Sequence, residues 1–201
     1  MEVVGVNIDA CAMVECFARL FRRASDVGRA VLFVDIGAAA TQVALSHGNK
    51  LVFARTLAMG GDQLEQAVAD GLKISMDQAR LLRRQSQVAQ PDPAAQDELY
   101  RLMDRPMNML ADELTQCLRY CESVFREQTV ERAIFVGGQA YDTRLCQSVA
   151  QRLNLPSQIG DPLIRVKVAP GITLHPGVDS RLPQPDWAVA VGLSLGAGSA
   201  A

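Results

Sequence analysis

Apolar runs between residues 30 and 57 predict a small β-meander. Ala30 to Ile36 is a nearly continuous apolar run, which is typical of a strand buried on both faces. Thr41 to His47 alternates between apolar and polar positions, and Lys50 to Leu57 alternates again after a turn at Gly48. Because only a few residues separate these runs, the three strands are expected to pair in antiparallel order.

Helical periodicity replaces the alternation after residue 61. Apolar residues at intervals of three and four mark one face of a first helix: Leu64, Ala67, Val68 and Leu72. Ser75 can cap a second, short helix from Met76 to about Gln85, with Ala79 and Leu82 facing inward. The polar, proline-containing stretch from Ser86 to Asp97 then predicts a linker or a mobile loop.

The longest helix is expected to begin near Pro106, since proline suits the first helical turn. Its apolar stripe consists of Met107, Leu110, Ala111, Leu114, Cys117, Leu118, Cys121, Val124 and Phe125. A stripe of this kind is most often core, and a groove that binds a partner is the alternative.

The remaining elements alternate between strands and helices. Valine-rich Glu2 to Ile8 reads as a strand, and Asp9 can cap the helix that follows it. The later elements are a buried strand over Arg132–Val136, a helix over Thr143–Leu153, a short strand near Leu163–Val168 and a helix opened by Pro185-Asp186. A meander followed by alternating helices and strands is the order of a ribonuclease-H-like lobe, which is an α/β fold with a mixed sheet flanked by helices.

Composition and charge narrow the possible functions. The 201 residues are 49% apolar and 21% charged, and the formal net charge is -2. A nearly balanced charge gives no electrostatic reason to expect binding of nucleic acid. No apolar run approaches the ~18 residues that a membrane-spanning helix needs. We therefore expect a cytoplasmic protein with no direct membrane insertion, which reaches a membrane only through partners.

Cysteines and arginines are clustered in predicted helices. Five cysteines lie next to apolar residues without a C-x-x-C pair, which predicts reduced, buried thiols rather than a metal site: Cys11, Cys16, Cys117, Cys121 and Cys146. Two groups of arginines are expected to form solvated helix faces: Arg19, Arg22 and Arg23, then Arg80, Arg83 and Arg84.

The first candidate binding loop follows the strand that ends at Ile36. Asp35 ends an apolar run, where an unpaired carboxylate would be costly unless Mg²⁺ or its bound waters compensated the charge. Gly37 allows a tight turn, Ala38 and Ala39 leave backbone N–H groups accessible, and Thr41 adds a hydroxyl. The hairpin could hold a phosphate group. The alternative is a simple tight turn.

The second candidate loop is Gly137-Gly138-Gln139, which follows another predicted buried strand. Two glycines allow a flat ring or a ribose to approach the backbone, and a following helix N-terminus favours phosphate. A strand-to-helix turn that needs positive φ is the alternative. A further diglycine, Gly60-Gly61, opens the helix that lies between the two loops in sequence.

Together these loops resemble the second lobe of the actin, heat-shock chaperone and sugar kinase superfamily, and within it the branch of PilM and FtsA. The matching segments are Phe33-Val34-Asp35-Ile36-Gly37 with Thr41, Phe53-Ala54-Arg55, Gly60-Gly61-Asp62-Gln63-Leu64, Ser75 to Arg83, Val136-Gly137-Gly138, Gly160-Asp161-Pro162-Leu163 and Ala188 to Leu193. The resemblance implies that the Asp35 hairpin is the second phosphate motif and that Gly137-Gly138 is the adenosine motif. ATP and Mg²⁺ are the implied ligands, with Mg²⁺ held by Asp35 through water.

The resemblance also implies a domain organisation. Residues 1–29 would be a connecting strand and helix that return from a first lobe that is missing here, and residues 30–201 the second lobe. Within it, 62–105 would be a reduced, partly helical subdomain. The family usually places an acidic residue and a lysine where this chain has Arg80 and Arg83. That difference puts the ribose contact in doubt and leaves a charged contact at Arg83.

The function implied is that of a PilM-like cytoplasmic scaffold in a type IV pilus or related secretion machine. ATP would act as a conformational ligand, and no catalytic residue is assigned because hydrolysis in the superfamily needs both lobes. The partner implied is the tail of a PilN-like inner-membrane protein, with self-association also possible. The alternatives are an actin-like interaction module without nucleotide and a fragment of a sugar-kinase-type phosphotransferase.

Overall fold

One mixed β-sheet organises the protein. The computed structural model describes residues 3, 5–18, 29–88, 92–125, 129–164, 166–167 and 181–196. The strands are β1 (Ala30–Ile36), β2 (Thr41–His47), β3 (Lys50–Leu57), β4 (Val130–Val136) and β5 (Ser157–Ile159). They form a five-stranded sheet in the order β3-β2-β1-β4-β5. The predicted meander is confirmed, since β1 pairs antiparallel with β2 and β2 with β3, whereas β4 runs parallel to β1 and β5 runs parallel to β4.

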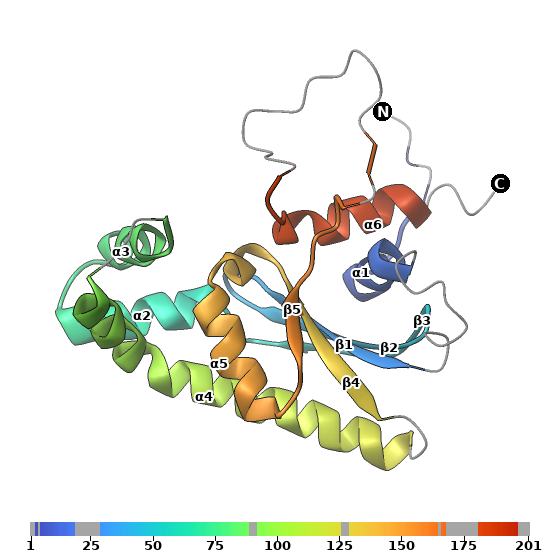
Figure 1. The fold of residues 1–201 in the computed structure, drawn as a ribbon, viewed down its shortest axis with the longest axis horizontal. Coiled ribbons are helices and arrows are strands. Elements are labelled where there is room, and N and C mark those ends of the chain that lie inside the picture. Colours follow the sequence, from blue (N-terminus) through green and yellow to red (C-terminus); the bar gives the residue numbers. More distant parts are fainter. Residues whose placement is uncertain are drawn as a thin grey trace.

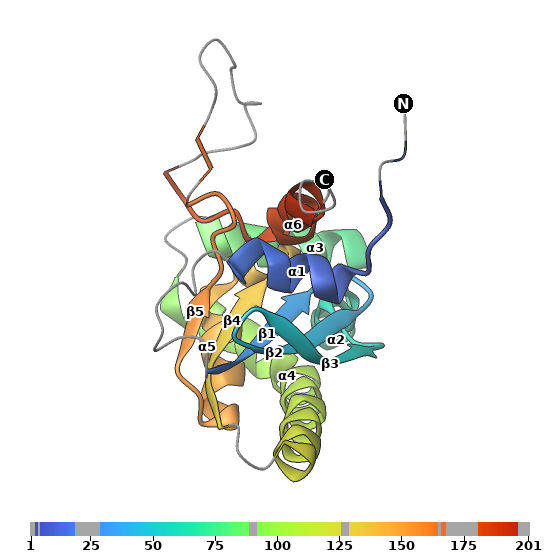
Figure 2. The same cartoon turned by 90° about the vertical axis from the view of Figure 1, so that its right-hand side faces the viewer.

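Helices cover both faces of the sheet (Figures 1 and 2). They are α1 (Asp9–Ala18), α2 (Gly61–Leu72), α3 (Met76–Val88), α4 (Pro93–Val124), α5 (Thr143–Leu153) and α6 (Ala188–Gly196), with 3₁₀ turns at Gly138–Tyr141 and Pro185–Trp187. Figure 2 shows α1 and α6 stacked on one face of the sheet and α4 on the other. None of the described helices is both long enough and apolar enough to cross a bilayer.

Alternation along the central strand β1 creates two cores. Leu32 and Val34 are buried in the larger core, which also contains residues of α2, α4 and α5. Val31 and Phe33 point to the opposite face and pack in a second core with α1 and Ala188 of α6. The same period of two places Asp35 on the side of α1. The predicted α/β fold, a mixed sheet flanked by helices, is therefore confirmed.

The predicted linker between Ser86 and Asp97 is wrong in most of its length. Helix α3 continues to Val88, and α4 begins at Pro93 rather than near Pro106. Asp92 caps α4 by accepting a hydrogen bond from the Ala94 N–H, and Pro93 occupies the first turn. Pro106 lies inside the 32-residue helix. The extra turns are stabilised because they continue the buried stripe through Leu99, Tyr100 and Met103.

Two predicted strands are also wrong. Within Glu2–Ile8, the described residues form no strand, and Val3 and Val6 are 80% and 93% exposed. Their valines favour extended backbone, but no neighbouring strand pairs with them there. Within Leu163–Val168, the described residues form a turn and coil. The fifth strand instead forms at Ser157–Ile159, directly beside β4.

The thiols and arginines differ in how well they match their predictions. All five cysteines are free, and all except the half-buried Cys11 are buried as predicted. Leu82 was expected to face inward but is 38% exposed. Arg83, on the contrary, is only 3% exposed, so the solvated face predicted for it is wrong. Arg19, Arg22 and Arg23 lie outside the described residues.

Candidate functional site

Three loops meet where the parallel strands β1 and β4 end. They are the hairpin of residues 37–40 after β1, the Gly60-Gly61 segment that opens α2, and the Gly137-Gly138 segment after β4. Asp35 pairs with Val136 across the two parallel strands, so the first and third loops leave the sheet side by side. Carboxyl ends of adjacent parallel strands commonly form binding sites in α/β proteins.

The hairpin and the start of α2 are held together by backbone hydrogen bonds. The Gly61 N–H donates to the Gly37 carbonyl at 2.9 Å, and the Asp62 N–H donates to the Ala38 carbonyl at 2.8 Å. The Thr41 hydroxyl is fully buried and donates to the Met59 carbonyl at 2.7 Å. These three donors therefore fix the shape of the loop pair.

Gly60 allows the two loops to approach so closely. A Cβ atom at this position would lie 2.6 Å from the Gly37 carbonyl oxygen and 2.9 Å from the Ala38 carbonyl carbon. The Gly60 N–H is also engaged, because it donates to Oε1 of Gln63, the third residue of α2, at 2.7 Å. The first turn of α2 is thus packed directly on the hairpin.

Ala38 and Ala39 form the exposed tip of the hairpin. Gly37 donates its N–H to the Ala40 carbonyl at 3.0 Å, which closes the turn. Among the described residues, the N–H groups of Ala38 and Ala39 have no hydrogen-bond acceptor. Successive backbone N–H groups without an acceptor can bind an anion.

Asp35 lies between the hairpin and the diglycine loop. No hydrogen bond to its carboxylate is formed within the described part of the chain. Burial, followed by the nearby charge of Asp9 at the start of α1, raises the pKa of Asp35 from 3.8 to about 6. The arrangement would favour a cation, or water bound to one, beside this carboxylate.

The diglycine loop is shaped by Gly137. Its φ is +86°, and a Cβ atom there would collide with the Asp35 carboxylate. The Gly137 N–H donates to the Pro185 carbonyl at 3.0 Å, which ties the loop to the beginning of the last helix. Gly138 has open space where a Cβ atom would be, and the Gln139 side chain rests against Gly61.

Arg83 is the one expected site residue that lies away from the loop tips. Its guanidinium is 3.8 Å from Glu65 Oε1 and 3.6 Å from Asp142 Oδ2, within ion-pair range of both. Glu65, on α2, also accepts a hydrogen bond from Arg80 Nε and forms an ion pair with Arg80 Nη2. The structure thus brings together Asp35, the hairpin, Gly60-Gly61 and Gly137-Gly138-Gln139. Arg83 lies apart from these loops, against Glu65 and Asp142.

Sequence reasoning did not identify the buried partners of Arg83. Asp142 caps α5 by accepting a hydrogen bond from the Leu145 N–H at 2.9 Å, and it also accepts one from the Tyr100 hydroxyl. Two signals were available. Asp142 directly precedes a predicted helix, and Glu65 lies on the apolar face of α2 beside Leu64. A charged residue on a buried face normally has a partner.

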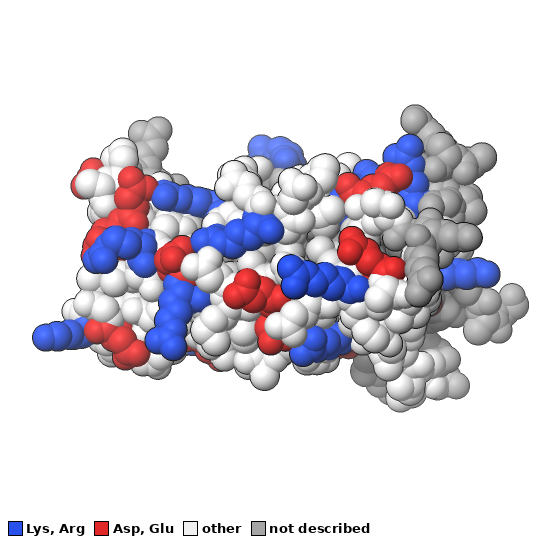
Figure 3. Space-filling model, turned by 90° about the horizontal axis from the view of Figure 1, so that it is seen from below, with Lys and Arg blue, Asp and Glu red and all other residues white. Residues whose placement is uncertain are grey.

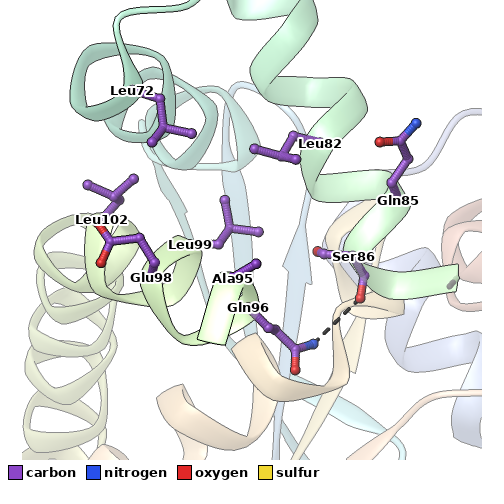
Figure 4. A pocket seen from close by; sticks show the side chains of 9 residues that line it. All are labelled: Leu72, Leu82, Gln85, Ser86, Ala95, Gln96, Glu98, Leu99 and Leu102. Carbon is purple, nitrogen blue, oxygen red and sulfur yellow. Dashed lines mark hydrogen bonds between the residues drawn. The ribbon is translucent and has the colours of Figure 1, made fainter. Parts of the chain in front are cut away.

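Two further hollows lie elsewhere on the molecule. One, of about 360 Å³, is a groove between α2, α3 and α4 (Figure 4), lined by Leu72, Leu82, Gln85, Ser86, Ala95, Gln96, Glu98, Leu99 and Leu102. The other lies between α4 and α5 and includes Tyr100 and Arg144. Figure 3 shows basic and acidic side chains interleaved on the lower face. Arg152 of α5 pairs with Asp104 of α4. Neither hollow contains an expected site residue.

The sheet order and the three converging loops define an actin-like fold. A meander leads into parallel strands β4 and β5, and helices flank both sides. Within that class, the chain belongs to the family described as "Type IV pilus assembly protein PilM", whose family model matches residues 1–197.

Several known proteins are similar to this chain in sequence or in fold. The cell division protein FtsA of Bacillus subtilis (strain 168) is 28% identical over 72 residues, which is 36% of this chain and 16% of FtsA. A PilM–PilN type IV pilus biogenesis complex superposes with a TM-score of 0.76 and 23% identity, over 96% of this chain and 53% of that one. MreB5 of Spiroplasma citri bound to AMPPNP gives a TM-score of 0.61 and 13% identity, over 93% and 57%. The chain thus spans about half the length of these similar structures.

Proposed function

We propose that this chain binds ATP with Mg²⁺ at the three converging loops, as the nucleotide-binding part of a scaffold in type IV pilus assembly. The observation that carries the proposal is Asp35. Its carboxylate is partly buried, has no hydrogen-bond donor among the described residues and lies against Gly137, near the end of the strand that leads into the hairpin. A hydrated Mg²⁺ would compensate the charge, and the N–H groups would bind phosphate.

The similar structures support the choice of ligand. The MreB5 structure contains AMPPNP, a non-hydrolysable relative of ATP. In this chain, the open space at Gly138 would allow the adenosine part to lie against the backbone. Asp35, Ala38 and Ala39 would bind the phosphates and Mg²⁺, while Gly37, Thr41, Gly60 and Gly61 would shape the site.

ATP would act as a conformational ligand rather than as a fuel. The proposed contacts are Asp35 and the N–H groups of Ala38 and Ala39, whereas in-line attack by water also needs groups that position the nucleophile. Binding would favour one arrangement of the loops and the adjoining helices α3 and α6. We expect turnover by this chain to be negligible.

The proposed partner is the tail of a PilN-like inner-membrane protein, because a similar structure is a PilM–PilN complex. This would place a cytoplasmic protein at the inner membrane. Co-purification of the chain with the tail of the PilN-like protein of the same organism tests it. Retention of the tail is expected, and its absence with and without ATP would contradict this partner.

Calorimetric titration of the chain with ATP tests the proposed ligand. Binding should require Mg²⁺ and weaken about tenfold or more in Asp35→Ala, since a charged contact contributes roughly 1.5–3 kcal/mol. It should also weaken as pH falls through about 6, where Asp35 becomes protonated. Asp112→Ala, at an exposed position of α4, is the control.

One observation favours the alternative of an interaction module without nucleotide. The Thr41 hydroxyl and the N–H groups of Gly60 and Gly61 already have acceptors within the protein. If wild-type protein fails to bind ATP, or if Asp35→Ala binds it equally well, this alternative is preferred. Rapid Mg²⁺-dependent hydrolysis would instead contradict the role of ATP as a conformational ligand.

A further inference from the structure

Helix α3 reaches the diglycine loop through a buried arginine. Arg83 is 3% exposed, and its Nη2 is 3.6 Å from Asp142 Oδ2. This distance is within ion-pair range but longer than a hydrogen bond. Within the described part of the chain, Arg83 Nε and Nη2 have no hydrogen-bond acceptor. Attraction between charges therefore accounts for much of the contact between α3 and Asp142.

Asp142 fixes the downstream end of the diglycine loop. It directly follows the 3₁₀ turn Gly138–Tyr141, and it caps α5 through the Leu145 N–H. The carboxylate is 3% exposed and also accepts a hydrogen bond from the Tyr100 hydroxyl of α4. The upstream end is held separately, by the Gly137 N–H and the Pro185 carbonyl. The position of Asp142 therefore decides where the loop between them lies.

A second arginine of α3 reaches towards the other loops. Arg80 donates to Glu65 Oε2 at 3.0 Å, and its Nη2 is 3.7 Å from Asp62 Oδ1. The Asp62 N–H in turn donates to the Ala38 carbonyl of the hairpin. Glu65 also faces Arg83 at 3.8 Å. One helix is thus connected by charged side chains to both sides of the candidate site.

We propose that Arg83 is a positioning residue, which holds the diglycine loop in its nucleotide-binding arrangement by attracting Asp142. The inference rests on the proposed binding of ATP. Arg83 need not touch the nucleotide, because its effect passes through the residue that ends the loop. Displacement of α3 would release Asp142 from this attraction and allow Gly138–Tyr141 to move. Ligand affinity would then depend on whether α3 is docked.

Arg83→Met tests the inference without removing the buried stem of the side chain. The variant should fold, because Glu65 keeps the hydrogen bond that it accepts from Arg80, and Asp142 keeps those that it accepts from Tyr100 and Leu145. Arg84→Met is the matched control, since it makes the same substitution at an exposed position one residue further along α3.

Hydrogen exchange and ATP affinity are measured on both variants. In the nucleotide-free Arg83→Met protein, amides of residues 138–142 should exchange about tenfold faster, while those of β1 and β4 stay unchanged. The dissociation constant for ATP should rise about 2- to 30-fold, the range of indirect coupling between neighbouring elements. Arg84→Met should change neither quantity, and Arg83→Lys should recover part of both.

Several outcomes would overturn the inference. Unchanged exchange of residues 138–142 in Arg83→Met would do so, and so would faster exchange throughout the chain, which would indicate a purely structural role. The inference would also be overturned if residues 138–142 of Arg83→Met exchanged faster while the affinity for ATP stayed unchanged. Failure of the wild-type chain to bind ATP is a different result: it contradicts the proposed function itself.

If Arg83→Met does not fold, Asp142→Asn replaces it. Asparagine keeps a side-chain oxygen for Leu145 and Tyr100 but removes the charge that faces Arg83. The same local acceleration of exchange is expected, together with weaker binding of ATP. Normal exchange and normal affinity in this variant would refute the role assigned to the Arg83–Asp142 pair.

Discussion

Replacement of Asp35 by asparagine should stabilise the nucleotide-free protein at neutral pH. Burial at the end of β1, with the charge of Asp9 nearby, raises the pKa of Asp35 from 3.8 to about 6. The ionised carboxylate is therefore less favourable in the folded protein than in the unfolded chain. Asparagine has nearly the same shape and carries no charge. A residue expected to bind a ligand would thus be destabilising in the absence of that ligand.

The pH dependence follows from the direction of this change. Because the folded pKa is the higher one, the folded protein binds the Asp35 proton more tightly than the unfolded chain does. The resulting stabilisation is fully present below about pH 4 and is lost as pH rises through about 6. The rise in the pKa of Asp35 from 3.8 to about 6 corresponds to a change of roughly 3 kcal/mol in the free energy of unfolding. Partial exposure to solvent reduces the expected effect to about 1–3 kcal/mol.

Thermal unfolding at two pH values measures the effect. At pH 7.5, Asp35→Asn should raise Tm by about 2–10 °C, as expected for a protein of this size. Near pH 4, where Asp35 of the wild-type protein is protonated, the two proteins should unfold at nearly the same temperature. Asp112→Asn, which removes an exposed charge from α4, should show no such pH-dependent difference.

A lower stability of Asp35→Asn than of wild type at pH 7.5 would refute the claim that the ionised Asp35 carboxylate destabilises the nucleotide-free protein. The claim would also be refuted if the difference in Tm were the same at both pH values, since the charge would then have no part in it. Addition of Mg²⁺ and ATP should reverse the order at pH 7.5, because only the wild-type carboxylate can favour the cation.

Three further predictions concern residues around the same loops. Gly137→Ala should destabilise the protein by about 2–3 kcal/mol in urea unfolding, because its φ is +86° and its Cβ would collide with Asp35; an effect below about 0.5 kcal/mol would contradict this geometry. Asp142→Ala should cost about 2–4 kcal/mol through loss of the α5 cap and the Tyr100 partner, and an unchanged unfolding midpoint would exclude both contacts. In the folded protein, iodoacetamide should modify half-buried Cys11 first, whereas Cys16, with its pKa raised to about 12 by burial, should react only on unfolding; mass spectrometry of the labelled peptides distinguishes the two.

The sheet was predictable because its signals are local. The bounds of β1, β2 and β3 agree with the apolar patterns from which they were predicted, and short turns left antiparallel pairing as the natural arrangement. Helix α5 was equally predictable from the sequence, since its apolar stripe is bounded by Asp142 and by Asn154, which has a left-handed conformation. In each case the pattern and the capping residues indicate the same element.

The errors arose where local preference and tertiary packing disagree. Prolines between Ser86 and Asp97 suggested a linker, yet Pro93 begins a helix whose stripe continues onto the core. Pro106 was placed at a helix start but lies inside α4, where burial of its neighbours offsets the missing hydrogen bond. Strand preference alone misplaced Glu2–Ile8, because an isolated strand without a sheet neighbour gains little.

The loops of the candidate site could be predicted from the sequence, but the side-chain contacts that connect them could not. Glycines and the aspartate near the end of β1 identified the loops, because each residue type has a local conformational or electrostatic reason to be there. Contacts such as Arg83 with Asp142 join helices that are far apart in the chain, and no local pattern encodes them. The hydrogen bond from the Thr41 hydroxyl to the Met59 carbonyl likewise could not be predicted from the sequence, because it depends on how the two loops pack.

A crystal structure of the chain with a non-hydrolysable ATP analogue and Mg²⁺ would show whether the three loops bind nucleotide. We expect phosphate oxygens at the Ala38 and Ala39 N–H groups, Mg²⁺ linked to Asp35 through water, and the adenosine part beside Gly137-Gly138. A nucleotide bound elsewhere, for example in the groove between α2, α3 and α4, would contradict this expectation, as would crystals grown at saturating nucleotide that show none at these loops.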